Sequence, residues 1–141
     1  MLIGEYDCSI DIKGRLNFPA KLREDLGDSF IISKSTGGEP CLCVYSLTEW
    51  KEKHDKLKLL PGEAKEKLQR YLFSSACESN PDKQGRIVIP QKLREFAGLE
   101  KEVTVIGSDD HCEIWSAREW CANGEQMDRE AIRQLAKSVG Y

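Results

Sequence analysis

Two short stretches of the chain place an arginine directly after a turn glycine, a spacing suited to binding an anion. Residues 11–15 read Asp-Ile-Lys-Gly-Arg, and residues 82–86 read Asp-Lys-Gln-Gly-Arg. An Asp at the first position and a Gly at the fourth favour a tight turn, because the carboxylate accepts from the backbone ahead and glycine tolerates a positive φ. A guanidinium beside such a turn can contact a phosphate, or the O6 and N7 atoms of guanine, through two N–H groups. The pattern therefore indicates a surface that binds nucleic acid.

Ten residues are candidates for this surface or for its frame. The expected DNA contacts are Lys13, Arg15, Lys83 and Arg86. The expected frame consists of Asp11, Gly14, Arg23, Asp82, Gly85 and Arg94. Arg23 and Arg94, the last residues of the two copies, could pair with the turn aspartates and brace the hairpin. They could instead contact DNA, and both possibilities stay open. For one copy alone, the alternative is an ordinary surface turn with a local Asp–Arg ion pair, which contributes under about 1 kcal/mol.

The distribution of charge favours a polyanion partner although the chain as a whole is acidic. The formal net charge is −3 over 141 residues. Residues 11–23 and 82–94 each carry four basic side chains and one aspartate, a net charge of +3 each, so the remainder carries −9. A basic face on an acidic body attracts phosphates to one side and repels them from the other.

The two basic stretches belong to an internal repeat. Residues 11–27 match residues 82–98 at an offset of 71, and residues 44–50 match 114–120 at an offset of 70. This change of offset predicts that the second half has lost a single residue from the loop between these two stretches, because loops tolerate such deletions. Because the identical residues occur in the same order in both stretches, we expect two structural halves with the same order of helices and strands.

Each half is expected to contain an extended segment, a turn, a short strand, a short helix and two more strands. The helix should begin with Pro19 or Pro90 at its first position and end at Gly27 or Gly98. The expected extended segments and strands are 3–10, 15–18, 29–33 and 42–45 in the first half, and 76–81, 86–89, 102–106 and 112–115 in the second.

Helices are expected after each half, since Ser46–Glu49 and Ser116–Glu119 both have the Ser-x-x-Glu spacing of a capping box. The first helix should reach about Leu60 and a second should run over 63–74, whereas the C-terminal helix should be interrupted near residues 123–124. Trp50 and Trp120 are expected to pack against the core or an interface. The predicted organisation is a first half over 1–47, a helical pair over 48–75, a second half over 76–116 and a C-terminal helix over 117–141.

Several functional classes find no support in the sequence. No apolar run approaches the roughly 18 residues that span a bilayer, so we expect a cytoplasmic protein without a membrane partner. No cofactor, catalytic or metal-binding motif is present, and we expect no enzyme activity. The six cysteines have no C-x-x-C spacing and are expected to be reduced apolar fillers: Cys8, Cys41, Cys43, Cys77, Cys112 and Cys121.

The doubled motif resembles that of the MraZ family, on Asp-x-Lys-Gly-Arg-x-x-x-Pro-x-x-x-Arg at residues 11–23 and its second copy at 82–94. The resemblance covers nearly the whole chain, although Gln84 stands where the first copy has Lys13. It implies an α+β fold in which two AbrB-like halves form a small β-barrel, with capped helices after each half. It further implies a ring of several subunits on the nucleoid that binds double-stranded DNA with direct repeats. Those repeats would lie in the promoter of the division and cell-wall gene cluster, which includes the protein's own gene.

Two further expectations concern partners. The helical pair carries an apolar stripe that could face a neighbouring subunit: Trp50, Leu57, Leu60, Leu68, Tyr71 and Leu72. An antitoxin-like interaction module is the alternative function, in which the C-terminal residues 127–141 would wrap around a partner protein and DNA binding would be secondary.

Overall fold

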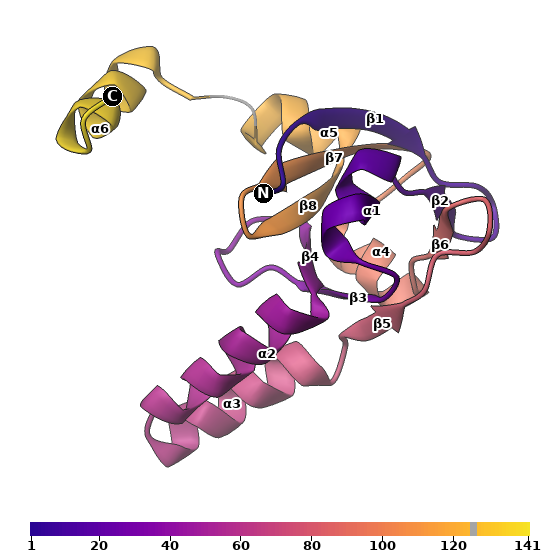
Figure 1. Cartoon of the computed structure of the whole chain (residues 1–141), viewed down its shortest axis with the longest axis horizontal. Coiled ribbons are helices and arrows are strands. Elements are labelled where there is room, and N and C mark those ends of the chain that lie inside the picture. Colours follow the sequence, from indigo (N-terminus) through magenta and orange to yellow (C-terminus); the bar gives the residue numbers. More distant parts are fainter. Residues whose placement is uncertain (125–126) are drawn as a thin grey trace.

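The computed structural model describes residues 1–124 and 127–141, and its elements follow the same order in both halves (Figure 1). The elements of the first half are β1 (Glu5–Ser9), β2 (Arg15–Asn17), α1 (Ala20–Leu26), β3 (Phe30–Lys34) and β4 (Leu42–Ser46). Those of the second half are β5 (Cys77–Ser79), β6 (Arg86–Val88), α4 (Gln91–Ala97), β7 (Glu102–Ser108) and β8 (His111–Ser116). The repeat in the sequence is therefore a repeat in structure.

Helices follow each half, as the capping boxes predict. The first set is α2 (Leu47–Lys56), the 3-10 turn η1 (Leu57–Leu59) and α3 (Gly62–Phe73), and the second is α5 (Ala117–Glu119), the π-helical η2 (Trp120–Gly124) and α6 (Arg129–Ser138). The Ser46 and Ser116 hydroxyls accept from the backbone N–H groups of Glu49 and Glu119. The last helix was expected to be interrupted near residues 123–124; η2 ends at Gly124 and α6 begins at Arg129, and residues 125–126 lie outside the described part of the chain.

The strands form an open antiparallel sheet and a separate ribbon. The six-stranded sheet has the order β1-β7-β8-β4-β3-β5, and β2 pairs with β6 alone. The α+β class is confirmed. The closed barrel implied by the family resemblance is not what the backbone pairing shows, because β1 and β5 are the edges of the sheet. An isolated bridge between Ile10 and Leu16 links the β1 edge to the ribbon.

Strand pairing interleaves the two halves. β1 of the first half pairs with β7 of the second, and β5 of the second half pairs with β3 of the first. The other two inter-half pairs join equivalent strands, β2 with β6 and β4 with β8. The halves therefore share one core, and neither completes its sheet without the other.

The register of these pairs corrects the predicted loop change. Cys8 pairs with Val103. Ser79, which corresponds to Cys8 in the second half at the offset of 71, pairs with Phe30. Because these two pairs are related by the repeat, Phe30 in the first half corresponds to Val103 in the second. Their offset is 73, two more than the offset of 71 between the turns. β4 and β8 are equivalent at an offset of 70, because Leu42 pairs with Ile114 and Val44 with Cys112. The second half has thus gained two residues before β7 and lost three between β7 and β8, where the sequence had predicted a single loss.

The short helices close over a core drawn from both halves. Leu22 of α1 and Leu93 of α4 are buried beside Phe30 and Val105 of the sheet. Pro19 and Pro90 lie at the N-cap, with φ of −54° and −57°, so each helix begins one residue later than predicted. The predicted ends at Gly27 and Gly98 are confirmed, and both glycines have a positive φ.

The helical hairpin formed by α2, η1 and α3 extends away from this core, and so does the last helix, α6 (Figure 1). Trp50 packs on Tyr45 with ring centroids 5.8 Å apart, and Trp120 packs on Trp115 at 5.6 Å. Both tryptophans therefore have the packing role expected of them. No described helix combines the length and the apolar character that crossing a membrane requires.

Candidate nucleic-acid interface

Each Asp-x-x-Gly-Arg stretch forms the predicted turn, and the aspartate organises it. Asp11 Oδ1 accepts from the backbone N–H groups of Lys13 and Arg15, both at 2.9 Å. The N–H of Gly14 donates to the carbonyl of Asp11 at 2.9 Å, and Gly14 has a φ of 81°, which glycine adopts without strain. The turn thus has its own internal hydrogen bonds before any side chain contacts a ligand.

The second turn repeats this geometry. Asp82 Oδ1 accepts from the N–H groups of Gln84 and Arg86 at 2.9 Å, and Gly85 has a φ of 82°. In both turns the hydrogen bond from the arginine backbone N–H, followed by the one from its side chain, holds the pKa of the aspartate below its usual value. Both carboxylates therefore stay charged well into the acid range.

The turn aspartates also hold the arginine side chains. Arg15 Nε lies 2.6 Å from Asp11 Oδ2, and Arg86 Nε lies 2.9 Å from Asp82 Oδ2. The two arginine side chains retain 36% and 34% exposure, less than the open exposure expected from the sequence, because the aspartates cover part of each. Within residues 1–124 and 127–141 the terminal N–H groups of both guanidiniums make no hydrogen bond, so they can reach a ligand from a fixed position.

The ribbon brings the two arginines to one face. Arg15 pairs with Val88, Leu16 with Ile87, and Asn17 with Arg86. The central pair is buried, and because side chains alternate along a strand, the other four residues share the outer face. Arg15 and Arg86 are diagonal neighbours there, a relation that places backbones about 7–8 Å apart. The sequence predicted each arginine singly and missed Asn17 and Val88, which a period of two around Leu16 and Ile87 would have found.

The two trailing arginines, for which two roles were left open, donate to backbone carbonyls and lie against the opposite turns. Arg23 Nε donates to the carbonyl of Phe18 at 3.0 Å, and Arg94 Nε donates to that of Ile89 at 2.9 Å. A Cβ on Gly85 would lie 2.6 Å from Arg23 Nη2, so this guanidinium lies directly against the turn of the opposite half. Arg94 lies in the same way against Gly14, 3.0 Å from the Cβ position. Each half therefore supports the turn of the other.

The remaining candidates, Lys13 and Lys83, are exposed at the turns. Ile12 is exposed as well, at 99%. Lys13 precedes Gly14 directly, whereas Lys83 lies two residues before Gly85. The two lysines thus occupy different turn positions, and Ile12 is the structural mate of Lys83.

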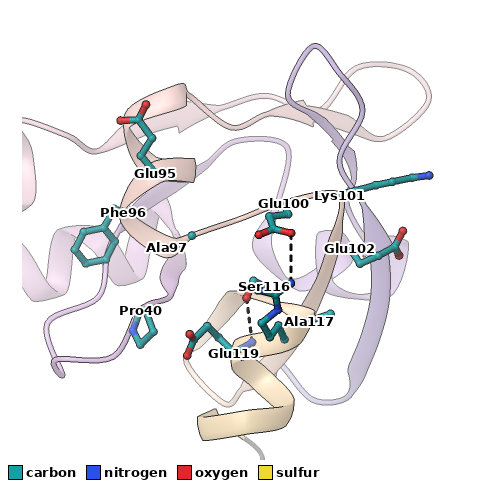
Figure 2. Close-up of a pocket in the computed structure, with 12 residues that line it drawn as sticks. Pro40, Glu95, Phe96, Ala97, Glu100, Lys101, Glu102, Ser116, Ala117 and Glu119 are labelled. Carbon is teal, nitrogen blue, oxygen red and sulfur yellow. Dashed lines mark hydrogen bonds and ion pairs between the residues drawn. The ribbon is translucent and has the colours of Figure 1, made fainter.

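An acidic hollow elsewhere on the body is unsuited to a polyanion. It measures about 510 Å³ and lies between the end of α4, the start of β7 and α5 (Figure 2). Glu95, Glu100, Glu102 and Glu119 line it, against two basic side chains, Lys101 and Arg118. Its charge agrees with the acidic remainder inferred from the sequence and leaves the ribbon as the basic face.

A second group of polar side chains, which the sequence did not reveal, lies along the outer face of β4 and β8. His111 Nε2 lies 2.9 Å from Glu113 Oε2, and His111 Nδ1 lies 2.7 Å from Asp110 Oδ1. The hydrogen bond with Glu113 raises the pKa of His111 to about 9, with burial acting against it and Asp110 acting with Glu113. Trp115 Nε1 donates to Glu113 at 2.9 Å. Among the described residues no cluster of three or more His, Cys, Asp or Glu is arranged to hold a metal ion.

Comparisons with known proteins match the chain over almost its full length. A family model described as "MraZ protein, putative antitoxin-like" matches residues 1–69 and 72–138. A relative from Caldicellulosiruptor bescii is 46% identical over 99% of both chains, and one from Clostridium beijerinckii is 44% identical over 99% of both. A relative from Alkaliphilus metalliredigens is 52% identical over 85% of this chain and 84% of its own. All three relatives are named transcriptional regulator MraZ.

Proposed function

The chain belongs to the MraZ family, and from this premise we propose that it is a transcriptional regulator that binds double-stranded DNA through the β2–β6 ribbon. One observation carries the proposal: antiparallel pairing brings Arg15 and Arg86, each held by its turn aspartate, onto one outer face. The relatives' name supports regulation of transcription, and the basic ribbon supplies a surface for it.

The dimensions and chemistry of the ribbon suit the major groove. A two-stranded ribbon fits the groove, which is about 12 Å wide. The two guanidiniums can each contact guanine through O6 and N7, while Lys13 and Lys83 contact phosphates at either side. Because the Nε of each arginine is occupied by an aspartate, fewer rotamers are lost on binding than for a free side chain.

The finer features implied by the family complete the proposal. The protein would act on direct repeats in the promoter of the division and cell-wall gene cluster, including its own promoter, on the nucleoid in the cytoplasm. It would do so as a ring, since one ribbon binds weakly and several ribbons on one assembly raise avidity.

The apolar stripe proposed as a ring contact needs one change. Leu57 is buried inside the helical hairpin, and Trp50, Leu68 and Leu72 are half-buried. The residues exposed to a neighbour are instead Leu59, Leu60, Tyr71 and Phe73. Leu60 and Tyr71 are common to both sets.

Sequencing the DNA cross-linked to the protein in its host tests the proposal. We expect enrichment of closely spaced repeats upstream of the division gene cluster. The purified protein should bind a three-box duplex far more tightly than a one-box duplex, with an affinity that falls linearly with salt on logarithmic axes. Equal binding of one box and three, or a mass near the 16.0 kDa of one chain in light scattering, would contradict the ring.

A second candidate function rests on the family description, which includes the words "putative antitoxin-like". The C-terminal segment supports it, since Ile132 and Leu135 of α6 and Val139 directly after it are 43%, 65% and 73% exposed. Helices this short are marginal in water without a packing partner. Purification from the host followed by identification of co-eluting chains distinguishes the two: an equimolar second protein bound through 127–141 would favour the antitoxin-like role.

A further inference from the structure

The outer face of the ribbon has two chemically different ends, although the backbone is symmetric about the Leu16–Ile87 pair. Residues 71 apart are structural mates in the two turns and strands. The arginines are mates of each other, but Ile12 is the mate of Lys83 and Val88 is the mate of Asn17. Ile12 and Val88, both apolar, therefore each correspond to a polar residue in the other half.

The two apolar residues lie at the same end. Val88 pairs with Arg15, and the N–H of Ile89 donates to the carbonyl of Gly14 at 2.9 Å. This pairing places the 11–14 turn, which contains Ile12, at the end of the ribbon where Val88 lies. Ile12 is 99% exposed and Val88 56% exposed, next to the basic Arg15. One end of the ribbon thus combines two exposed β-branched side chains with positive charge.

The opposite end is polar throughout. Asn17 pairs with Arg86, and the N–H of Phe18 donates to the carbonyl of Gly85 at 3.0 Å. The 82–85 turn, with Lys83 and Gln84, therefore lies beside Asn17. Side-chain amides at this end can donate and accept at once, which neither Ile12 nor Val88 can do.

We propose that the ribbon binds its DNA site in one orientation, with Ile12 and Val88 against thymine C5-methyl groups at one end. This inference rests on the proposed function of DNA binding. In the major groove the methyl group of thymine is the apolar feature, whereas adenine presents the N6 and N7 pair that an Asn or Gln amide contacts in two places. The Ile12–Val88 end therefore faces thymine, and the Asn17–Gln84 end faces adenine.

The test uses DNA that differs by one methyl group. A random duplex library is first selected with the full-length protein, and single thymines of the selected site are then replaced by uracil, which lacks only the C5-methyl. We expect an affinity loss of about fourfold per contacted methyl, the factor that corresponds to burying one such group. The loss should occur at one end of the site.

Three variants connect that loss to the ribbon. In Ile12→Ala combined with Val88→Ala, the uracil duplex and the thymine duplex should bind equally. Ile12→Lys, which copies the second turn, should also reduce the methyl dependence while retaining affinity for phosphate. Ile3→Ala removes another exposed β-branched side chain, 66% exposed just before β1, and should keep the wild-type methyl dependence.

Distinct results would overturn the inference and the proposed function. If uracil has no effect at any position, or the double variant keeps the wild-type loss, Ile12 and Val88 do not contact thymine. Equal losses at both ends of the site would contradict a single orientation. If the library yields no bound duplex at all, DNA binding itself fails, and with it the inference.

Discussion

Two strand pairs lie on the same pseudo-twofold axis, and they have diverged to very different degrees. In the ribbon, Leu16 faces Ile87 across the axis, and in the large sheet Cys43 of β4 faces Glu113 of β8. The framework residues of the two turns are identical, aspartate for aspartate, glycine for glycine and arginine for arginine. Along β4 and β8, Cys41 corresponds to His111 and Cys43 to Glu113, so the His111–Glu113 pair has no counterpart in the first half.

The difference follows from what each pair contacts. The turns of the ribbon depend on each other, since Arg23 lies against Gly85 and Arg94 against Gly14, so a change in one turn disturbs the other half. The outer face of β4 and β8 is covered by helices of unequal length, and its residues form the His111–Glu113 network instead. The Asp-x-x-Gly-Arg framework of the turns thus keeps the symmetry, whereas the polar network on β4 and β8 does not.

The largest effect is expected from removing both ribbon arginines. Arg15→Ala combined with Arg86→Ala should weaken DNA binding by about 1–3 kcal/mol for each lost base contact, at unchanged stability. Arg133→Ala, an exposed arginine on α6, is the matched control and should bind as the wild type does. A mobility-shift titration with circular dichroism measures both properties, and unaltered affinity in the double variant would remove the ribbon from the interface.

The second prediction tests the mutual support of the turns. Gly85→Ala should lower the free energy of unfolding by about 2–3 kcal/mol, because its φ of 82° is unfavourable for alanine and its Cβ would displace Arg23. Gly14→Ala should have a smaller effect, since its Cβ would lie 3.0 Å, not 2.6 Å, from the opposing guanidinium. Urea denaturation of both variants gives the ranking. A reversed order would mean that the Arg23 contact is easily relieved.

The third prediction concerns the divergent pair and has a definite dependence on pH. The pKa of His111 is raised from 6.5 to about 9, mainly by the hydrogen bond with Glu113. Its stabilising contribution should be complete below about pH 6.5 and disappear as the pH rises through about 9. His111→Gln should therefore lower the free energy of unfolding by about 1.5 kcal/mol near pH 6 and hardly at all above pH 9.5.

DNA binding provides the control for that variant. His111→Gln should retain wild-type affinity at pH 6, because the network lies on the β4–β8 pair and not on the ribbon. A parallel loss of affinity and stability would mean that the two pairs are coupled. Equal destabilisation at pH 6 and pH 9.5 would show that packing, not charge, is the contribution of His111.

The smallest effect is expected from the lysines. Lys13→Ala and Lys83→Ala should each lower affinity modestly and equally for all DNA sequences, and reduce the slope of log affinity against log salt by about 1. Titrations at several salt concentrations measure that slope. A change in sequence preference, with the slope unaltered, would assign the lysine a base contact in place of a phosphate contact.

The sequence predicted local structure well and spatial relations between the halves poorly. The turns, the capped helices and the equivalence of the halves follow from short-range patterns such as Asp-x-x-Gly and Ser-x-x-Glu. The exchange of β1 and β5 between halves depends on long-range pairing, which no local pattern encodes. The contacts of Arg23 with Gly85 and of Arg94 with Gly14 were missed for the same reason, since they form only across the interface between halves. The loop changes were misjudged because a net difference of one residue concealed a gain of two and a loss of three.

Amide hydrogen exchange with and without a bound duplex tests the central claim most directly, because it reports on both strand pairs at once. We predict slower exchange on DNA binding at residues 11–17 and 82–88, with unchanged exchange in β4 (Leu42–Ser46) and β8 (His111–Ser116). Protection confined to β4, β8 or the helical hairpin, with the ribbon unaffected, would contradict the assignment of the ribbon as the DNA-binding surface.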